Sequence, residues 1–202
     1  MSDIIDLSGY KFGAIIFDCD NTIAKTSPVH YLAFSSALKK EGYQLPEDWY
    51  FERVGISGLD MLGEFRDTCG ADFDVNKVSR ESAAIFQKNI DKVRAVEPVA
   101  QIARDYYGKI PMAVASGGHR PVVEATLQAI GVRSLFPCVV TVEDVKKGKP
   151  APDLFLLAAE QLGVEPRLCL VFEDSDEGID AAHTAHMQVI DVRNALGPDY
   201  LK

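Results

Sequence analysis

Two aspartates separated by one cysteine follow a short apolar run near the start of the chain. The segment reads AIIFDCD, and its acids are Asp18 and Asp20. If the strand simply continued, both carboxylates would point to the same side, because side chains alternate along a strand. Two like charges held so close repel each other. The pair therefore predicts a bound cation, a reaction that uses the acids, or both.

Polar residues also follow three later apolar runs. Ser116 and Gly117 lie in ASGGHR, Lys149 lies in VEDVKKGKPAPD, and Glu173 and Asp174 lie in FEDSDEG. Taken singly, each motif has a structural explanation, such as a helix N-cap, a turn or a solvated lysine. Ligands of open parallel sheets bind beyond the carboxyl ends of the strands. We therefore expect these motifs to meet at one edge of a sheet.

The residue types in the motifs suit one chemistry. Carboxylate oxygens are ligands for a hard cation, and Mg²⁺ uses few of them alongside phosphate oxygens and water. The serine, the glycine N–H and the lysine supply donors and positive charge for a phosphate group. A carboxylate left over beside them could act as a nucleophile. The combination predicts phosphoryl transfer.

The apolar runs predict a parallel sheet. They do not alternate polar and apolar residues, which is typical of strands buried on both faces, and they cover residues 12–17, 111–115, 138–142, 169–172 and 188–192. Amphipathic segments at 120–132 and 152–164 predict helices, each with a glycine that can serve as a C-cap. This order predicts an α/β doubly wound fold.

The first two predicted strands of the sheet are far apart in the chain. Residues 25–95 carry helical patterns, such as HYLAFSSALKKEGY and KVSRESAAIFQKNIDKV, and little that resembles a strand. A structureless loop of that length is implausible inside a compact domain. We therefore expect a core domain made of residues 1–24 and 95–202, with a small helical cap domain at 25–94.

Composition excludes several classes of protein. The 202 residues carry a net charge of -9 and no basic stripe, so nucleic acid is not an expected partner. The four cysteines form no C-x-x-C pair, which disfavours a zinc or redox motif. No apolar stretch approaches the ~18 residues of a membrane span, and the N-terminus does not resemble a signal peptide. We expect a cytoplasmic monomer that acts on a small phosphate ester.

The motifs D-x-D-x-T, ASGG, KGKPAPD and FEDS, in this order, resemble the four motifs of the haloacid dehalogenase superfamily. The resemblance covers nearly the whole chain, including a helical cap after the first motif. The segments VEPV, IPMAVASG and KGKPAPDLFLLAA resemble the β-phosphoglucomutase-like branch, which includes bacterial fructose-1-phosphate and 6-phosphogluconate phosphatases.

The resemblance implies a role for each acid. Asp18 would attack phosphorus and form an aspartyl phosphate, and Asp20 would protonate the leaving alcohol and then activate water. Mg²⁺ would be held by the carboxylates of Asp18 and Asp174 and by the backbone carbonyl of Asp20. Glu173 would support a bound water.

The resemblance also implies which residues hold the substrate. Ser116, Gly117 and Lys149 would hold the phosphoryl oxygens. These residues contact only phosphate, so cap residues must select the rest of the substrate. His30 and Ser57 are the candidates, although His30 opens an amphipathic helix and could equally pack there.

Three positions depart from the family pattern. Asn21 and His186 each stand where the family commonly has glycine, and Lys25 stands where it has an aspartate at the cap hinge. Asparagine tolerates the left-handed backbone better than most residues, so the turn at position 21 can form. None of the three removes a catalytic group.

Other activities of the superfamily, and other classes of protein, fit less well. Dehalogenases lack the second acid, so Asp20 argues against this activity. A phosphonatase needs a lysine in the cap. The lysines available there, Lys77, Lys88 and Lys92, are more simply explained as surface lysines. A signalling receiver domain is shorter and has no cap. A binding protein with a degenerate site is disfavoured because the motifs are intact.

A sugar phosphomutase is the main alternative to a phosphatase. Mutases of this branch resemble the chain in both acids, the cap and a histidine at position 30, but carry an arginine after Gly-x-Ser in the cap, where this chain has Gly58. Thr22 matches the phosphatase form of the first motif. Arg53 is close enough in sequence to supply the missing charge. We expect a phosphatase.

Overall fold

The structure is a computed structural model that describes residues 5–197 and 200–201. The chain divides into two compact units. The core unit comprises Met1–Lys25 and Arg94–Lys202, and the inserted unit comprises Thr26–Val93. These divisions lie one residue from the predicted boundaries.

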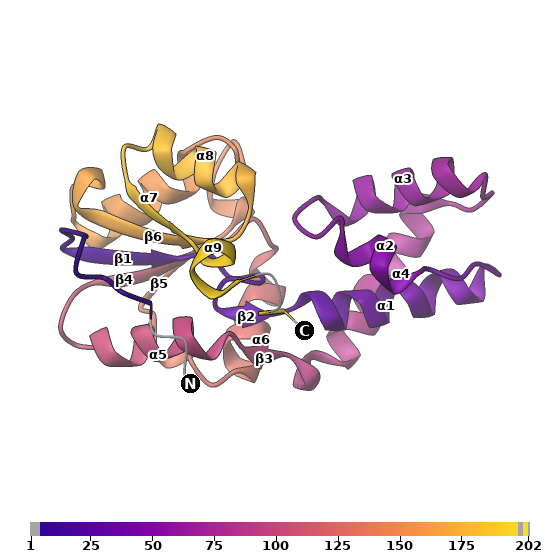
Figure 1. The fold of residues 1–202 in the computed structure, drawn as a ribbon, viewed down its shortest axis with the longest axis horizontal. Helices are drawn as coiled ribbons and strands as arrows, with labels where there is room; N and C mark the ends of the chain where they lie inside the picture. Colours follow the sequence, from indigo (N-terminus) through magenta and orange to yellow (C-terminus); the bar gives the residue numbers. More distant parts are fainter. Residues whose placement is uncertain (1–4, 198–199, 202) are drawn as a thin grey trace. The chain divides into compact units, whose positions relative to one another are not determined.

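A five-stranded parallel sheet forms the centre of the core unit (Figure 1). In spatial order the strands are β5 (Cys138–Val140), β4 (Met112–Ala115), β1 (Ala14–Phe17), β6 (Cys169–Glu173) and β7 (Gln188–Asp191). Every predicted run overlaps one of these strands, and the predicted doubly wound fold is confirmed.

One predicted strand ends two residues earlier than expected. The run at 138–142 continues only to Val140 because a 3₁₀ turn, η3 (Val142–Asp144), begins two residues later. Thr141 caps this turn, and the Asp144 carboxylate accepts a hydrogen bond from the Thr141 N–H (2.8 Å). The apolar pattern extends through residue 142, but the capping box ends the strand.

The register brings the strand ends together at one edge. Phe17, the last residue of β1, lies opposite Val114 of β4 and Phe172 of β6. Asp18 continues the pairing by donating its N–H to the Phe172 carbonyl (3.0 Å). The motif residues therefore begin at the same level of neighbouring strands.

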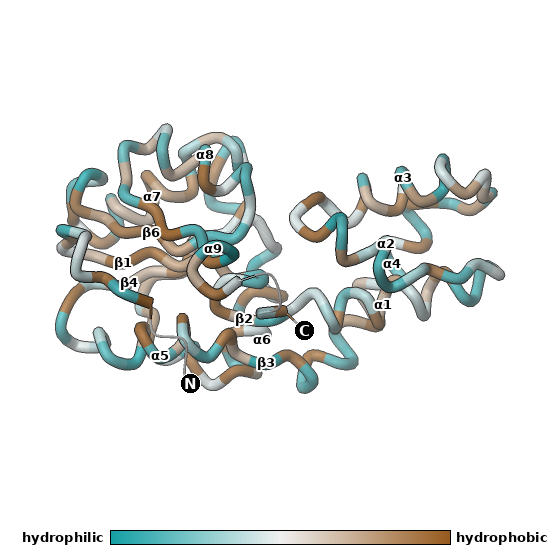
Figure 2. Tube along the Cα trace, in the orientation of Figure 1, coloured by the Kyte–Doolittle hydropathy of each residue, from teal (hydrophilic) through white to brown (hydrophobic). Residues whose placement is uncertain are grey.

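Helices cover both faces of the sheet (Figure 1). On one face lie α7 (Asp153–Leu162) and α8 (Asp176–Thr184), and on the other lie α5 (Glu97–Tyr106) and α6 (Arg120–Ala129). The strands are mostly hydrophobic along the tube in Figure 2. Burial on both faces explains the absence of alternation in their sequences.

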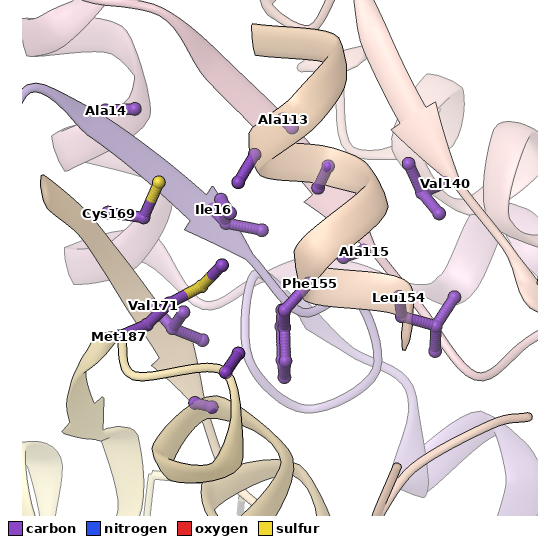
Figure 3. Close-up of a cluster of buried hydrophobic side chains, with 14 of the residues drawn as sticks. Ala14, Ile16, Ala113, Ala115, Val140, Leu154, Phe155, Cys169, Val171 and Met187 are labelled. Carbon is purple, nitrogen blue, oxygen red and sulfur yellow. The ribbon is translucent and has the colours of Figure 1, made fainter. Parts of the chain in front are cut away.

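The core between the sheet and α7 is close-packed. Figure 3 shows Leu154 and Phe155 of α7 packed against Ile16 of β1 and Val171 of β6. All four side chains are fully buried. Truncating a buried phenylalanine such as Phe155 to alanine typically costs about 3–5 kcal/mol. This packing fixes the strands whose ends carry the motifs.

The predicted glycine C-cap is present in one of the two helices, and in the other the glycine lies one residue beyond the C-cap. α7 ends at Gly163, whose φ of 67° is in the left-handed region, as expected for a C-cap. In α6 the C-cap is Ile130, and the left-handed Gly131 follows one residue later with φ of 72°.

A short antiparallel ribbon joins the two ends of the inserted segment within the core unit. It consists of β2 (Ala24–Lys25) and β3 (Arg94–Ala95). Two residues per strand are too few to show a periodic pattern, so the sequence does not predict this ribbon. The other short elements of the core unit are η2 (Arg133–Leu135), η4 (Pro166–Leu168) and α9 (Val192–Leu196).

The inserted unit is helical and has its own apolar cluster. Its elements are α1 (Ser27–Lys40), α2 (Glu47–Phe51), α3 (Gly58–Cys69), α4 (Val75–Lys88) and the 3₁₀ turn η1 (Ile90–Lys92). Leu38, Leu62 and Phe65 are almost completely buried within it.

The four cysteines are free, and three of them, Cys19, Cys138 and Cys169, are buried. Within the part of the chain that the structure describes, no helix combines the length and apolar character needed to cross a membrane.

Candidate active site

Asp18 begins the site at the end of β1. Its side chain is nearly buried. The chain then turns back, with Asn21 in the left-handed region (φ 58°) and the Ala24 N–H donating to the Cys19 carbonyl (3.0 Å). The strand does not continue past Phe17, so the condition under which period-two geometry would place Asp18 and Asp20 on the same side is not met. Asparagine at position 21 adopts the backbone conformation for which the family commonly uses glycine.

Asp20 lies next to the turn that follows β4. A Cβ placed on Gly118 would lie 3.3 Å from the Ser116 Oγ and 3.6 Å from Oδ2 of Asp20. The carboxylate and the hydroxyl therefore flank the same glycine. The structure thus brings together motif residues that are almost a hundred positions apart in the sequence.

Lys149 is held between two acids. Its Nζ lies 2.5 Å from Oδ1 of Asp18 and 2.6 Å from Oε2 of Glu173. The lysine side chain is only 9% exposed, and its ammonium lies 5.0 Å from the centre of the Phe155 ring. A buried charge is stable only when paired, and these contacts pair it.

Glu173 is enclosed by the start of α8. Its Oε1 accepts hydrogen bonds from the N–H of Asp174 (3.1 Å) and from the N–H and hydroxyl of Ser175 (3.0 and 2.8 Å). A Cβ placed on Gly178 would lie 2.1 Å from both Cδ and Oε2 of Glu173. Only glycine at position 178 leaves room for this carboxylate.

Asp174 completes a buried acidic cluster. Its Oδ1 accepts a hydrogen bond from the fully buried hydroxyl of Thr22 (2.9 Å). One carboxylate oxygen from each of Asp18, Glu173 and Asp174 lies within 4.8 Å of the others. An all-oxygen set of this spacing fits a hard cation such as Mg²⁺.

The electrostatics of the cluster also favour a cation. Burial, followed by the charge of Glu173, raises the pKa of Asp18 well above its ordinary value, although Lys149 opposes the shift. The same causes raise the pKa of Asp174 to about 7. Burial alone would lower the pKa of Lys149, but Asp18 and Glu173 raise it, so the lysine stays charged. One lysine therefore faces three acids, and a divalent cation would relieve the repulsion.

Groups suited to a phosphate lie beside the cluster. The buried Ser116 donates its N–H to the Val140 carbonyl (3.0 Å), and its Oγ accepts from the Gly118 N–H (3.0 Å). Gly117 between them is exposed, and among the described residues no atom outside its neighbours lies within 4 Å of where its Cβ would be. A phosphate oxygen could therefore approach this backbone closely.

The two predicted substrate-selecting residues belong to the inserted unit. The His30 ring stacks on Phe86, with centroids 4.0 Å apart and planes at 13°. Ser57 caps α3 by accepting from the Asp60 N–H (3.2 Å), and its hydroxyl donates to the Asp60 carboxylate (2.6 Å). These contacts give both residues a structural role. Their predicted role in substrate selection stays a prediction.

Arg53, the possible replacement for a mutase arginine, already has partners. Its guanidinium donates to Oε1 of Glu64 (2.8 Å) and to the Trp49 carbonyl (3.0 Å), and lies 4.0 Å from the centre of the Trp49 ring.

A family comparison agrees with this geometry. Residues 15–192 match the model of the family described as haloacid dehalogenase-like hydrolase. The chain belongs to this family. This match confirms the predicted family and the prediction that the chain is an enzyme.

Known proteins similar to this hydrolase include phosphatases. Fructose-1-phosphate phosphatase YqaB of Escherichia coli (strain K12) is 36% identical over 184 residues, which cover 91% of this chain and 97% of the relative. The crystal structure of CbbY from Rhodobacter sphaeroides in complex with phosphate is 26% identical with a TM-score of 0.76, over 89% of this chain and 85% of that one.

A mutase shares the fold of this hydrolase. The crystal structure of β-phosphoglucomutase from Clostridium difficile has a TM-score of 0.71 at 23% identity, over 94% of this chain and 95% of that one. At this identity the likeness concerns the fold alone and does not separate the two activities.

Sequence reasoning missed one residue of this hydrolase's site, Gly178. Its signal is a glycine at a fixed distance after the acids of FEDSDEG. The reason for that glycine becomes visible only when the Glu173 side chain is placed.

Proposed function

We propose that this hydrolase is a Mg²⁺-dependent phosphatase acting on a small phosphorylated metabolite, with sugar phosphates as the substrate class. The observation that carries the proposal is the buried group of Asp18, Glu173 and Asp174 with Lys149 paired to two of them. The similarity to a fructose-1-phosphate phosphatase over 91% of this chain supports the substrate class. The expected monomeric state and cytoplasmic location stay predictions.

The reaction would proceed in two steps at Asp18. First, an Asp18 oxygen attacks phosphorus, the bond from phosphorus to the ester oxygen breaks, and Asp20 gives its proton to that oxygen. Second, Asp20 takes a proton from a water molecule, whose oxygen attacks phosphorus, and the bond to Asp18 breaks. Inorganic phosphate leaves, and both aspartates return to their starting states.

The other residues would bind and orient the phosphate. Ser116, the Gly117 N–H and Lys149 would hold the phosphoryl oxygens, where hydrogen bonds to developing charge are most effective. The carboxylates of Asp18 and Asp174 and the carbonyl of Asp20 would hold Mg²⁺, with Glu173 behind them. When bound, the cation supplies positive charge that favours ionised acids and offsets the charge of the phosphate.

Two contacts in the inserted unit support a phosphatase over a sugar phosphomutase. A Cβ on Gly58 would lie 2.8 Å from Cζ of Phe34, so an arginine there requires this mostly buried ring to move. Arg53 is engaged by Glu64 and Trp49. A mutase must bind a second phosphate in its cap, and neither position offers a free cation for it.

The experiment is a screen of phosphorylated metabolites with Mg²⁺, in which free phosphate is measured. We expect sugar phosphates among the substrates and no turnover in EDTA. A hexose 1-phosphate then separates the two activities. Release of inorganic phosphate supports the proposal, whereas accumulation of the 6-phosphate isomer with little free phosphate identifies a mutase.

A further inference from the structure

The loop between β4 and α6 carries two of the proposed phosphate-binding residues, Ser116 and Gly117, and a second glycine, Gly118, follows them. Glycine has more backbone freedom than any other residue, so a loop with two in succession does not hold one conformation by itself. At the first end of the loop the Ser116 N–H donates to the Val140 carbonyl (3.0 Å), which continues the pairing of β4 with β5. A fixed loop needs a second anchor after the glycines.

Glu143 supplies that anchor from the turn η3. Its Oε1 lies 2.7 Å from Nδ1 of His119, and its Oε2 accepts a hydrogen bond from the Arg120 N–H (3.2 Å). His119 is the N-cap and Arg120 the first residue of α6, so an acid from a different loop caps this helix. A carboxylate is favourable there, because the first N–H groups of a helix lack acceptors within the helix.

The turn that carries Glu143 is itself held in place. Asp144 accepts hydrogen bonds from the N–H and the hydroxyl of Thr141 (2.8 and 3.0 Å), and Thr141 is fully buried. The Arg120 guanidinium pairs with Asp144 and donates to the Val139 carbonyl (3.0 Å). The start of α6 is therefore joined to the end of β5 through two acids, Glu143 and Asp144.

We propose that Glu143 is a positioning residue, which holds the loop at residues 116–119 in the conformation that presents its donors to the phosphate group. Glu143 acts through His119 and Arg120 rather than through the substrate, because a carboxylate repels a phosphate. Donors that are already in position stabilise the charge of a transferring phosphoryl group better than mobile ones. The inference rests on the proposed phosphatase function.

The test compares Glu143→Ala with Glu143→Gln. Both variants remove a negative charge near the loop, which by itself would strengthen binding of orthophosphate. Glutamine keeps an oxygen that can accept from the Arg120 N–H, whereas alanine does not, so Glu143→Gln should stay within about 3-fold of the wild-type affinity. In calorimetric titrations with orthophosphate and MgCl₂, Glu143→Ala should bind roughly 3- to 30-fold more weakly than wild type, the range that corresponds to loss of a helix cap.

Asp74→Ala is the matched control. Asp74 also caps a helix, by accepting from the N–H groups of Asn76 and Lys77 (2.9 and 3.1 Å), but it belongs to the inserted unit. This variant should lose stability to a similar degree and bind orthophosphate like wild type. His119 is 78% and Glu143 44% exposed, and exposed pairs contribute little to stability, so the Glu143 variants should fold.

Hydrogen exchange of the ligand-free protein gives a second measurement. The Gly118 N–H donates to the Ser116 Oγ (3.0 Å), so its exchange rate reports how often the loop opens. This amide should exchange faster in Glu143→Ala than in wild type or in Asp74→Ala.

Three results would overturn the inference. Unchanged or tighter orthophosphate binding by Glu143→Ala would show that Glu143 acts only as a nearby charge, and an equal loss in Asp74→Ala would show that the effect follows stability. Unchanged exchange of the Gly118 amide would show that Glu143 does not hold the loop. If wild type neither binds orthophosphate nor releases it from phosphate esters, the proposed function fails and the inference with it. If wild type does both and Glu143→Ala matches it, the inference fails alone.

Discussion

Replacing Gly178 with alanine should disrupt the site without touching a catalytic group. The new Cβ would lie 2.1 Å from Cδ and Oε2 of Glu173 and 2.6 Å from its Cγ, so the side chain must move. That side chain is 1% exposed and is held through both oxygens by Asp174, Ser175 and Lys149. The carboxylate cannot shift without losing these bonds.

The magnitude follows from two costs and one gain. Overpacking costs typically ~1–3 kcal/mol, and separating a buried ion pair costs ~3–5 kcal/mol. Alanine in place of glycine within a helix returns ~1 kcal/mol. We therefore expect the free energy of unfolding to fall by about 3–7 kcal/mol. For a protein of this length the melting temperature should fall by roughly 6–28 °C.

Thermal and urea denaturation of the metal-free protein measure this effect. Gly63→Ala is the matched control, because Gly63 also lies within a helix and, in the part of the chain that the structure describes, no atom beyond its own helix backbone lies within 4 Å of the added Cβ. That variant should be as stable as wild type or slightly more stable. A double variant, Gly178→Ala with Glu173→Ala, should be no less stable than Glu173→Ala alone. If Gly178→Ala is as stable as Gly63→Ala, the argument from this close contact is wrong.

Further predictions concern chemistry, pH and the inserted unit. Asp18→Asn should abolish turnover because an amide cannot act as the nucleophile. Asp20→Asn should reduce kcat by about 10²–10⁴-fold. When Asp20→Asn is mixed briefly with substrate, mass spectrometry should find phosphate on Asp18, and phosphate on any other residue would contradict the assignment. The pKa of Asp174 is raised from 3.8 to about 7, so the folded metal-free protein holds a proton that the unfolded chain has released. Its free energy of unfolding should therefore fall as pH rises from about 4 to 7, relative to Asp174→Asn, and an equal pH dependence in the two proteins would refute this. Ser57→Ala should lower stability by ~1 kcal/mol through loss of the α3 cap, measured by urea denaturation, and an unchanged midpoint would show that the cap contributes nothing. His30→Ala should change the ratios of kcat/KM between sugar phosphates more than it changes aryl-phosphate turnover, and equal losses on all substrates would show that His30 only packs on Phe86.

The sequence predicts the core and its motif residues well because their signals are local. Each strand of the sheet is an apolar run, and each motif follows such a run directly. Parallel strands then bring the motifs to one edge whatever lies between them. Even the unusual Asn21 could be anticipated, because its left-handed conformation is a property of the residue type.

What the sequence could not predict depends on side chains far apart in the chain. Lys149 was expected to contact phosphate, but nothing in KGKPAPD indicates its pairing with Asp18 and Glu173. Arg53 was a possible phosphate ligand until Glu64 and Trp49 were seen to hold it. Such contacts depend on strand register and side-chain rotamers, which no short pattern encodes.

The ribbon of β2 and β3 has a consequence for how the family diversifies. Lys25 pairs with Arg94, so the inserted segment leaves the core unit and returns to it at neighbouring points. Its apolar cluster is built from its own residues. A genetic exchange at these two positions could replace residues 26–93 with a different insert while the sheet and its acids are inherited unchanged. Evolution could thus vary the insert and conserve the reaction chemistry, and the same two positions are the natural splice points for building chimaeras in the laboratory.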